Sequence, residues 1–154
     1  MRFFKPVILV AVLFGAAVGI GSYTFAYAKG GSYLRNDPQA CANCHVMGDH
    51  YASWLKSSHR AVAGCNDCHT PPGTIPKYLS KAGNGFRHAF AFTTGDFPVA
   101  IQITPGNVAV TEKACRGCHV QTTDAIDAHA EASAAEGDAL SCLRCHHDVG
   151  HWVR

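Results

Sequence analysis

Four copies of the motif Cys-x-x-Cys-His constrain this chain more than any other feature of its sequence. They are Cys41-Cys44-His45, Cys65-Cys68-His69, Cys115-Cys118-His119 and Cys142-Cys145-His146, and all eight cysteines belong to them. This motif is typical of haem c attachment, in which two thioethers hold the porphyrin and the histidine is presented to the iron. The sequence therefore predicts four covalently bound haem c groups.

Three other interpretations use paired cysteines: a disulfide framework, a thioredoxin-like redox pair and a zinc site. Zinc is bound by C-x-x-C pairs, but zinc coordination gives no reason for a histidine directly after every pair. Four perfect copies of the motif favour haem over all three. The formal net charge of +2 gives no indication of nucleic-acid binding.

The chain has 154 residues, too few for a large apolar core once a membrane segment is set aside. Four porphyrins would supply that core, and iron–histidine bonds would hold distant segments together. We therefore expect a mainly α fold with much irregular structure, short helices around the motifs and little sheet. Helices are predicted over residues 51–61 and 123–136, the second capped by Thr122 or Thr123, and a third begins at Pro76.

An uncharged segment of 22 residues runs from Val7 to Ala28, long enough to span a bilayer core of ~30 Å as a helix. Arg2 and Lys5 precede it, so the positive-inside rule keeps the start of the chain in the cytoplasm. The remainder would then be exported, which agrees with haem c attachment. We predict residues 1–30 as the anchor and residues 31–154 as a periplasmic tetrahaem domain.

A removable signal peptide is the competing interpretation, with cleavage after Ala28. Signal-peptide cores typically have ~7–15 apolar residues, and this segment is longer. Tyr23 and Tyr27 stand where an interfacial aromatic belt would lie. These features favour a retained single-pass anchor.

The haem domain has the pattern of a duplication. The half over about 31–75 carries the first two motifs with His59 between them, and the half over about 105–154 carries the last two with His129 between them. The segment between the halves is apolar and rich in aromatic residues. This segment contains four phenylalanines, Phe86, Phe90, Phe92 and Phe97. They either pack on haem faces or contact lipid or a partner, and the sequence does not distinguish these two interpretations.

Each iron has a second axial position, and six histidines lie outside the motifs: His50, His59, His88, His129, His147 and His151. Two histidines give a low-potential, six-coordinate iron, whereas methionine raises the potential. His59 and His129 are the strongest candidates because each lies on a predicted helix upstream of a motif, and His151 is next. His50 and His147 lie so near motif residues that surface roles are equally expected.

The first motif differs from the others because Met47 follows two residues after His45. Its thioether can take the iron of the first haem in place of His45, or it can pack against the porphyrin. The residues alone leave these alternatives open.

The anchor, the motif spacing, the sequence CHVM at the first motif and a histidine five residues after the last together resemble the NapC/NirT family of membrane-anchored tetrahaem quinol dehydrogenases. Within that family the pattern is similar to the small subunit of the cytochrome c nitrite reductase complex. The resemblance implies a chain in the inner membrane that oxidises menaquinol and passes electrons to a periplasmic pentahaem subunit, which reduces nitrite to ammonia. A periplasmic tetrahaem electron shuttle, soluble or anchored, is the alternative. A terminal reductase is a third possibility, but the C-x-x-C-K motif of such enzymes is absent.

The resemblance also implies roles for individual residues around the first haem. Met47 becomes its proximal ligand and His45 a structural neighbour, while Lys81 lies at the quinol pocket. His88 aligns with a position held by an aspartate in a relative, so it either ligates the first iron or takes a quinol proton. Lys81 and His88, with Arg87, would line a slot whose apolar wall is Phe86 and Phe90.

For the other irons, the motif histidines His69, His119 and His146 are the first ligands. The resemblance assigns His59 to the fourth haem and His151 to the third. The second haem takes either a lysine from the catalytic partner or His129.

Overall fold

The computed structural model describes residues 4–133 and 141–152, except for the side chains of 4, 45 and 127–133. Arg2 and the side chains of His45 and His129 therefore lie outside the described residues. The chain divides into two compact units, residues 1–35 and 36–154.

The first unit is built on one long helix, α1 (Phe4–Tyr27), of 24 residues. Its most apolar 18-residue stretch has a mean hydropathy of 2.1, and its length and composition are those of a membrane-spanning helix. A short 3₁₀ helix, η1 (Gly30–Leu34), follows. A Cβ atom at Gly30 would clash with the Phe25 ring, so a larger residue there would require this ring to move.

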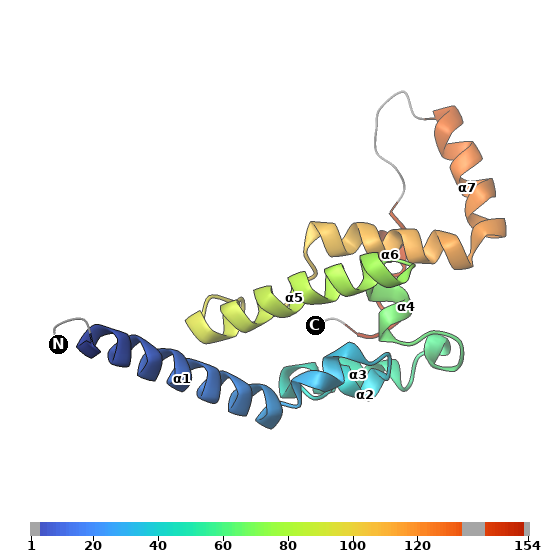
Figure 1. The fold of residues 1–154 in the computed structure, drawn as a ribbon. Helices are drawn as coiled ribbons and strands as arrows, with labels where there is room; N and C mark the ends of the chain where they lie inside the picture. The colour runs from blue at the N-terminus through green and yellow to red at the C-terminus, as the bar shows by residue number, and fades with distance from the viewer. Residues whose placement is uncertain (1–3, 134–140, 153–154) are drawn as a thin grey trace. The chain divides into compact units, whose positions relative to one another are not determined.

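The second unit consists of three longer helices, of 21, 14 and 14 residues, and several short ones (Figure 1). In chain order they are α2 (Pro38–Cys41), η2 (His45–Met47), α3 (Gly48–Trp54), η3 (Ser58–Ala61), α4 (Cys65–His69), α5 (Thr74–Thr94), α6 (Pro105–Cys118), α7 (Val120–Ser133) and α8 (Cys142–Cys145). No strand occurs within residues 4–133 and 141–152. The predicted mainly α fold with one amino-terminal apolar helix is confirmed.

Two predicted helices have different bounds in the structure. The helix expected over 51–61 ends at Trp54, and η3 forms separately, because the Trp54 indole donates a hydrogen bond to the Ala63 carbonyl (3.0 Å) and folds the chain back. The helix expected from 123 begins at Val120. Thr123 is not its cap, since its hydroxyl donates to the His119 carbonyl (3.2 Å) from inside the first turn.

Helix α5 has 21 residues and positions the region around Lys81. It begins at Thr74, two residues before Pro76, and the proline is tolerated because first-turn N–H groups have no partner within the helix. It ends at Gly95, whose φ of 74° gives a left-handed cap. Asn84 of α5 and Asn107 of α6 exchange two amide hydrogen bonds of 3.2 Å, which join the two helices.

The second unit has no conventional apolar core. Among the described residues no hydrophobic side chain is buried, and the buried side chains are Lys81, Thr111 and Thr123. Interiors of proteins of this size are normally filled by Leu, Ile, Val and Phe. These helices therefore fit an interior filled by a group other than protein side chains.

Candidate haem and substrate sites

Short helical turns present the cysteines of the last three motifs. Helix α4 carries Cys65 and Cys68, α6 ends with Cys115 and Cys118, and α8 consists of the fourth motif. Residues three apart on a helix lie on one face, so both sulfurs of a pair point to the same side. This local geometry is what two thioether bonds to one porphyrin require.

The four motifs follow one another in space as they do in the chain. The Cys41 and Cys65 thiols hydrogen-bond with each other, which joins the first motif to the second. Cys68 interacts electrostatically with Cys115, and Cys115 does so with Cys142. Groups attached at these cysteines would therefore form a continuous row.

Glu112 holds the fourth motif against α6. Its carboxylate accepts hydrogen bonds from the Ser141 hydroxyl (2.5 Å) and from the backbone N–H groups of Cys142 and Leu143 (3.0 Å each). Burial alone raises the pKa of Glu112, but these hydrogen bonds outweigh burial and lower the pKa from 4.5 to about 2. No sequence pattern identifies Glu112 as a residue that holds the fourth motif. The one indication is its position three residues before Cys115.

Two histidine pairs bring candidate axial ligands together. The ring centroids of His59 and His119 lie 6.1 Å apart, and those of His69 and His151 lie 5.9 Å apart. Metal–imidazole bonds are about 2 Å long and the nitrogen lies about 1 Å from the ring centre, so two imidazoles on opposite sides of one iron are about 6 Å apart. Each pair therefore has the separation expected of two histidines that ligate one iron.

His50 lies in the same cluster as His69 and His151. Its ring is 4.9 Å from that of His151, and the Nδ1 atoms of both are buried without a hydrogen-bond partner. Burial, followed by the charges of His151 and His50, lowers the pKa of His69 to about 4. A buried ring nitrogen without a partner costs about 1–3 kcal/mol, so these imidazoles fit a site that receives a cofactor.

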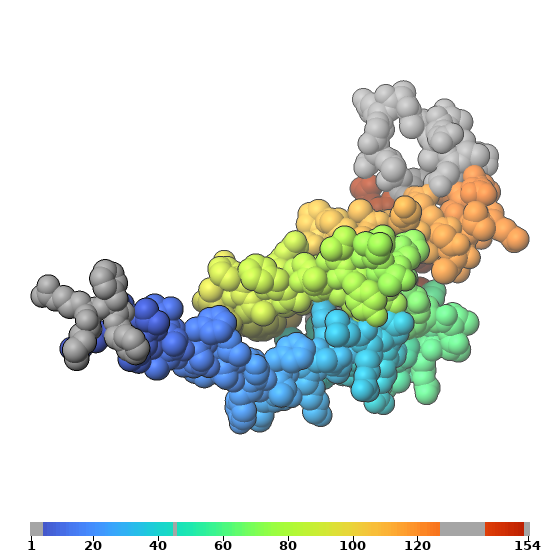
Figure 2. Space-filling model, in the orientation of Figure 1, coloured from blue at the N-terminus to red at the C-terminus, as the bar shows by residue number. Residues whose placement is uncertain are grey.

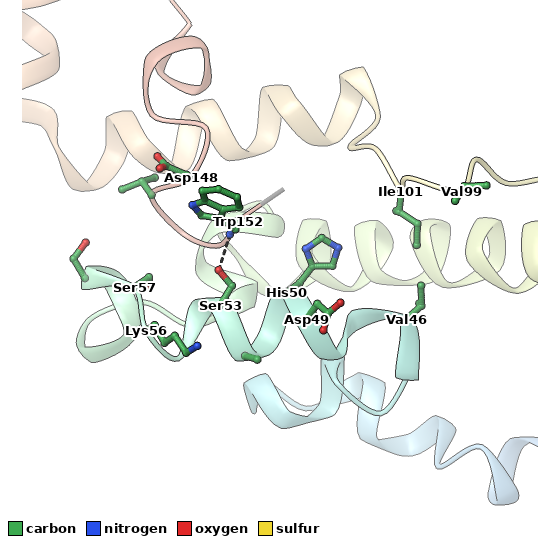
Figure 3. Close-up of a pocket in the computed structure, with 13 residues that line it drawn as sticks. Val46, Asp49, His50, Ser53, Lys56, Ser57, Val99, Ile101, Asp148 and Trp152 are labelled. Atoms are coloured by element: carbon green, nitrogen blue, oxygen red, sulfur yellow. Dashed lines mark hydrogen bonds between the residues drawn. The ribbon is translucent and has the colours of Figure 1, made fainter. Parts of the chain in front are cut away.

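A cavity of about 950 Å³ opens beside this cluster. Figure 3 shows its walls, formed by α3, the segment before α6 and the carboxyl-terminal segment. The backbone N–H of Trp152 donates to the Ser53 hydroxyl (2.7 Å), which closes one side. The volume lies at the upper end of the range for small-molecule and cofactor sites.

Lys81 is the most buried of the described residues, with 4% of its surface exposed. Burial lowers the pKa of Lys81, the nearby Lys77 lowers it further, and Cys41 opposes both. The Lys81 ammonium lies 5.9 Å from the centre of the Tyr78 ring. The interaction with Cys41 places this lysine beside the first motif.

His88 lies seven residues after Lys81, two turns further along the same side of α5. Partial desolvation, followed by the charge of Arg87, lowers the pKa of His88, although its side chain is exposed. Phe86 and Phe90 pack on each other with centroids 6.4 Å apart, but they project from the opposite side of the helix. The expected slot that joins Lys81 and His88 to these two rings is therefore wrong, because helical periodicity separates them.

The structure also places the remaining candidate ligands and aromatic residues. Met47 ends η2 and is partly buried immediately before α3. His146 and His147 are exposed. Phe92 packs on Phe97, with the two ring centroids 4.4 Å apart.

Comparisons with known proteins agree with this architecture. Residues 3–154 match the model of the NapC/NirT cytochrome c family, N-terminal region. Cytochrome c-type protein NrfH of Wolinella succinogenes is 36% identical, with 91% of this chain and 82% of the relative covered. Cytochrome c nitrite reductase subunit NrfH of Nitratidesulfovibrio vulgaris is 30% identical, with 95% and 86% covered. A crystal structure of the cytochrome c nitrite reductase NrfHA complex bound to the HQNO inhibitor contains a similar chain, with a TM-score of 0.62, 29% identity and coverage of 90% and 88%.

Proposed function

We propose that this chain, which belongs to the NapC/NirT cytochrome c family, is a tetrahaem quinol dehydrogenase subunit anchored in the inner membrane. It oxidises menaquinol and passes the electrons to a periplasmic nitrite reductase subunit. The proximity of buried Lys81 to the first motif is the observation that carries the proposal. The names of the relatives and the nitrite reductase complex with a similar chain support the choice of partner.

The eight motif cysteines would hold the haems. When bound, each haem would accept and pass on single electrons without protons. Quinol oxidation also releases two protons, so the chain must supply groups that bind the hydroxyls and accept their protons. Lys81 Nζ, held between the first motif and the Tyr78 ring, binds one hydroxyl. His88, on the same side of α5 and exposed, accepts the two protons one after the other and releases each to water.

The histidine pairs support an assignment that differs from the one implied by the resemblance. His59 serves the third haem with His119, and His151 serves the second haem with His69. His129 and His147 then become the candidates for the fourth haem, opposite His146. Met47 remains the candidate ligand for the first haem.

The experiment replaces Lys81 in the full-length haem-loaded protein and follows haem reduction by a menaquinol analogue in a stopped-flow spectrometer. A charged hydrogen bond contributes about 1.5–3 kcal/mol, so Lys81→Met should slow reduction about 10–100-fold. Lys81→Arg should retain part of the rate. His88→Gln should slow reduction in the same direction.

Lys113→Met is the matched control, because Lys113 is an exposed lysine on the neighbouring helix α6. It should leave the rate near that of the wild type, and every variant should retain four haems by mass spectrometry. A normal rate in both Lys81→Met and His88→Gln would contradict the site. It would favour a shuttle that receives electrons from another protein.

A further inference from the structure

Helix α5 carries an apolar stripe that faces away from the protein. Ile75, Leu79, Phe86 and Phe90 are spaced by four, seven and four residues, so they fall on one side of the helix. Their exposed fractions are 73%, 68%, 75% and 59%. Figure 2 shows α5 forming part of the outer surface of the second unit. A stripe of this kind normally faces a core.

The opposite side of α5 is polar and faces inward. Lys81 is buried there, and Asn84 is joined to Asn107 of α6. The helix is therefore inverted relative to a helix on the surface of a water-soluble protein. That orientation is stable where the medium outside the helix is itself apolar.

A porphyrin attached at the first motif does not cover this stripe. Lys81 is buried and interacts electrostatically with Cys41, whereas Phe90 lies about 180° from Lys81 around the helix axis at 100° per residue. The sequence between Thr70 and Ala114 also contains no cysteine to attach a haem on that side.

We propose that the stripe of α5, defined by Ile75, Leu79, Phe86 and Phe90, lies against the surface of the lipid bilayer, so that the second unit touches the membrane directly. Helix α1, which is long and apolar enough to span a membrane, ends at Tyr27, and the second unit begins at Asn36. The segment that joins them reaches at most about 30 Å when fully extended. The unit therefore cannot leave the vicinity of the bilayer.

The charges on α5 agree with a lipid occupant. The helix contains no acidic residue, and the exposed Arg87 lies about a quarter turn from the stripe around the helix axis. The stripe itself contains no charged side chain. An amphipathic helix that lies in the plane of the interface combines an apolar face with basic residues that suit anionic head groups.

The experiment uses the full-length haem-loaded protein in nanodiscs that contain a phospholipid with a photoreactive diazirine in its acyl chain. After illumination and trypsin digestion, mass spectrometry measures lipid adducts on peptides 78–81 and 82–87. Both peptides should carry adducts, together with peptides of α1. Peptide 57–60, at the start of η3, should carry none.

Paired variants identify the stripe as the cause. Ile75→Glu with Leu79→Glu should reduce adducts on peptide 82–87 about tenfold, because two apolar contacts are lost and two charges are added. Val62→Glu is the matched control; Val62 is 80% exposed and lies outside α5, and its replacement should change nothing. Haem content and helical circular dichroism should be those of the wild type in both.

Absence of adducts on 78–81 and 82–87 while α1 is labelled would overturn the proposal. Loss of these adducts on addition of the nitrite reductase subunit would also overturn it, since a protein would then occupy the stripe. Adducts that appear only when two copies share a nanodisc would assign the stripe to a second copy of the chain instead.

Discussion

Removal of the Glu112 charge tests how the fourth motif is held in place. In Glu112→Gln the side chain keeps its size but loses the carboxylate that binds Ser141, Cys142 and Leu143. A pKa that falls from 4.5 to about 2 corresponds to about 3 kcal/mol of stabilisation at neutral pH. Because Glu112 is partly exposed, solvent screening reduces this to about 2 kcal/mol.

The assay is thermal unfolding of the full-length protein in detergent, followed by far-ultraviolet circular dichroism. At pH 7 the melting temperature of Glu112→Gln should be about 6 °C below that of the wild type. Asp124→Asn is the control, because Asp124 is an exposed carboxylate on the neighbouring helix α7. It should change the melting temperature by less than about 2 °C.

The effect of pH follows from the direction of the pKa shift. The folded-state pKa of Glu112 lies below the unfolded-state value, so the stabilisation is fully present above about pH 4.5 and is lost as the pH falls toward 2. At pH 3 less than about half of it should remain. A decrease at pH 7 no larger than that of Asp124→Asn, or an equal decrease at pH 3 and pH 7, would refute the carboxylate's role.

Two further predictions concern the haem ligands and the anchor. His59→Leu and His151→Leu should each produce a high-spin electron paramagnetic resonance signal from one haem, with four haems still attached. His59→Leu combined with His119→Leu should still alter a single haem; two altered haems would show that His59 serves another iron. Amino-terminal sequencing of the protein from membranes should give a start before Val7, whereas a start at Lys29 would show that the apolar segment is removed.

Local chemistry made part of this fold predictable. Haem attachment depends on residues adjacent in the chain, so the motifs indicate their cofactor independently of any helix. The length and composition of the segment from Val7 to Ala28 likewise indicated α1. Both features depend on short sequence separations and on no tertiary contact.

The missed features depend on contacts between distant parts of the chain. Glu112 and Cys142 are thirty residues apart in the chain, and their hydrogen bond forms because α8 lies against α6 in the folded chain. The pairing of His59 with His119 requires η3 to face the end of α6, a separation over which motif spacing carries no information. The start of α7 at Val120 differs from the prediction because helix-start rules favour Thr122 or Thr123 as the cap, whereas the Thr123 hydroxyl donates backward to the carbonyls of His119 and Val120.

The inversion of α5 could not be predicted for a different physical reason. Its amphipathic pattern is plain in the sequence, but the usual rule turns the apolar side inward. The direction depends on what lies on each side of the helix, and neither a porphyrin nor a bilayer is encoded as a residue. Burial of Lys81 and exposure of Phe86 decide the direction in the structure.

This inversion restricts how a lipid-soluble quinol can reach Lys81. If the stripe of α5 lies on the bilayer, Lys81 is separated from the lipid by the thickness of the helix, about 10 Å. A quinol head group must therefore pass an edge of α5 rather than cross it. Of the residues on that inner side, Lys77 and Ser80 lie one turn or less before Lys81, and His88 lies two turns after it. Bulky replacements at Ser80 should therefore slow haem reduction by a long-tailed menaquinol more than by a short water-soluble analogue, whereas the same replacement at Leu79, on the lipid side, should affect both equally.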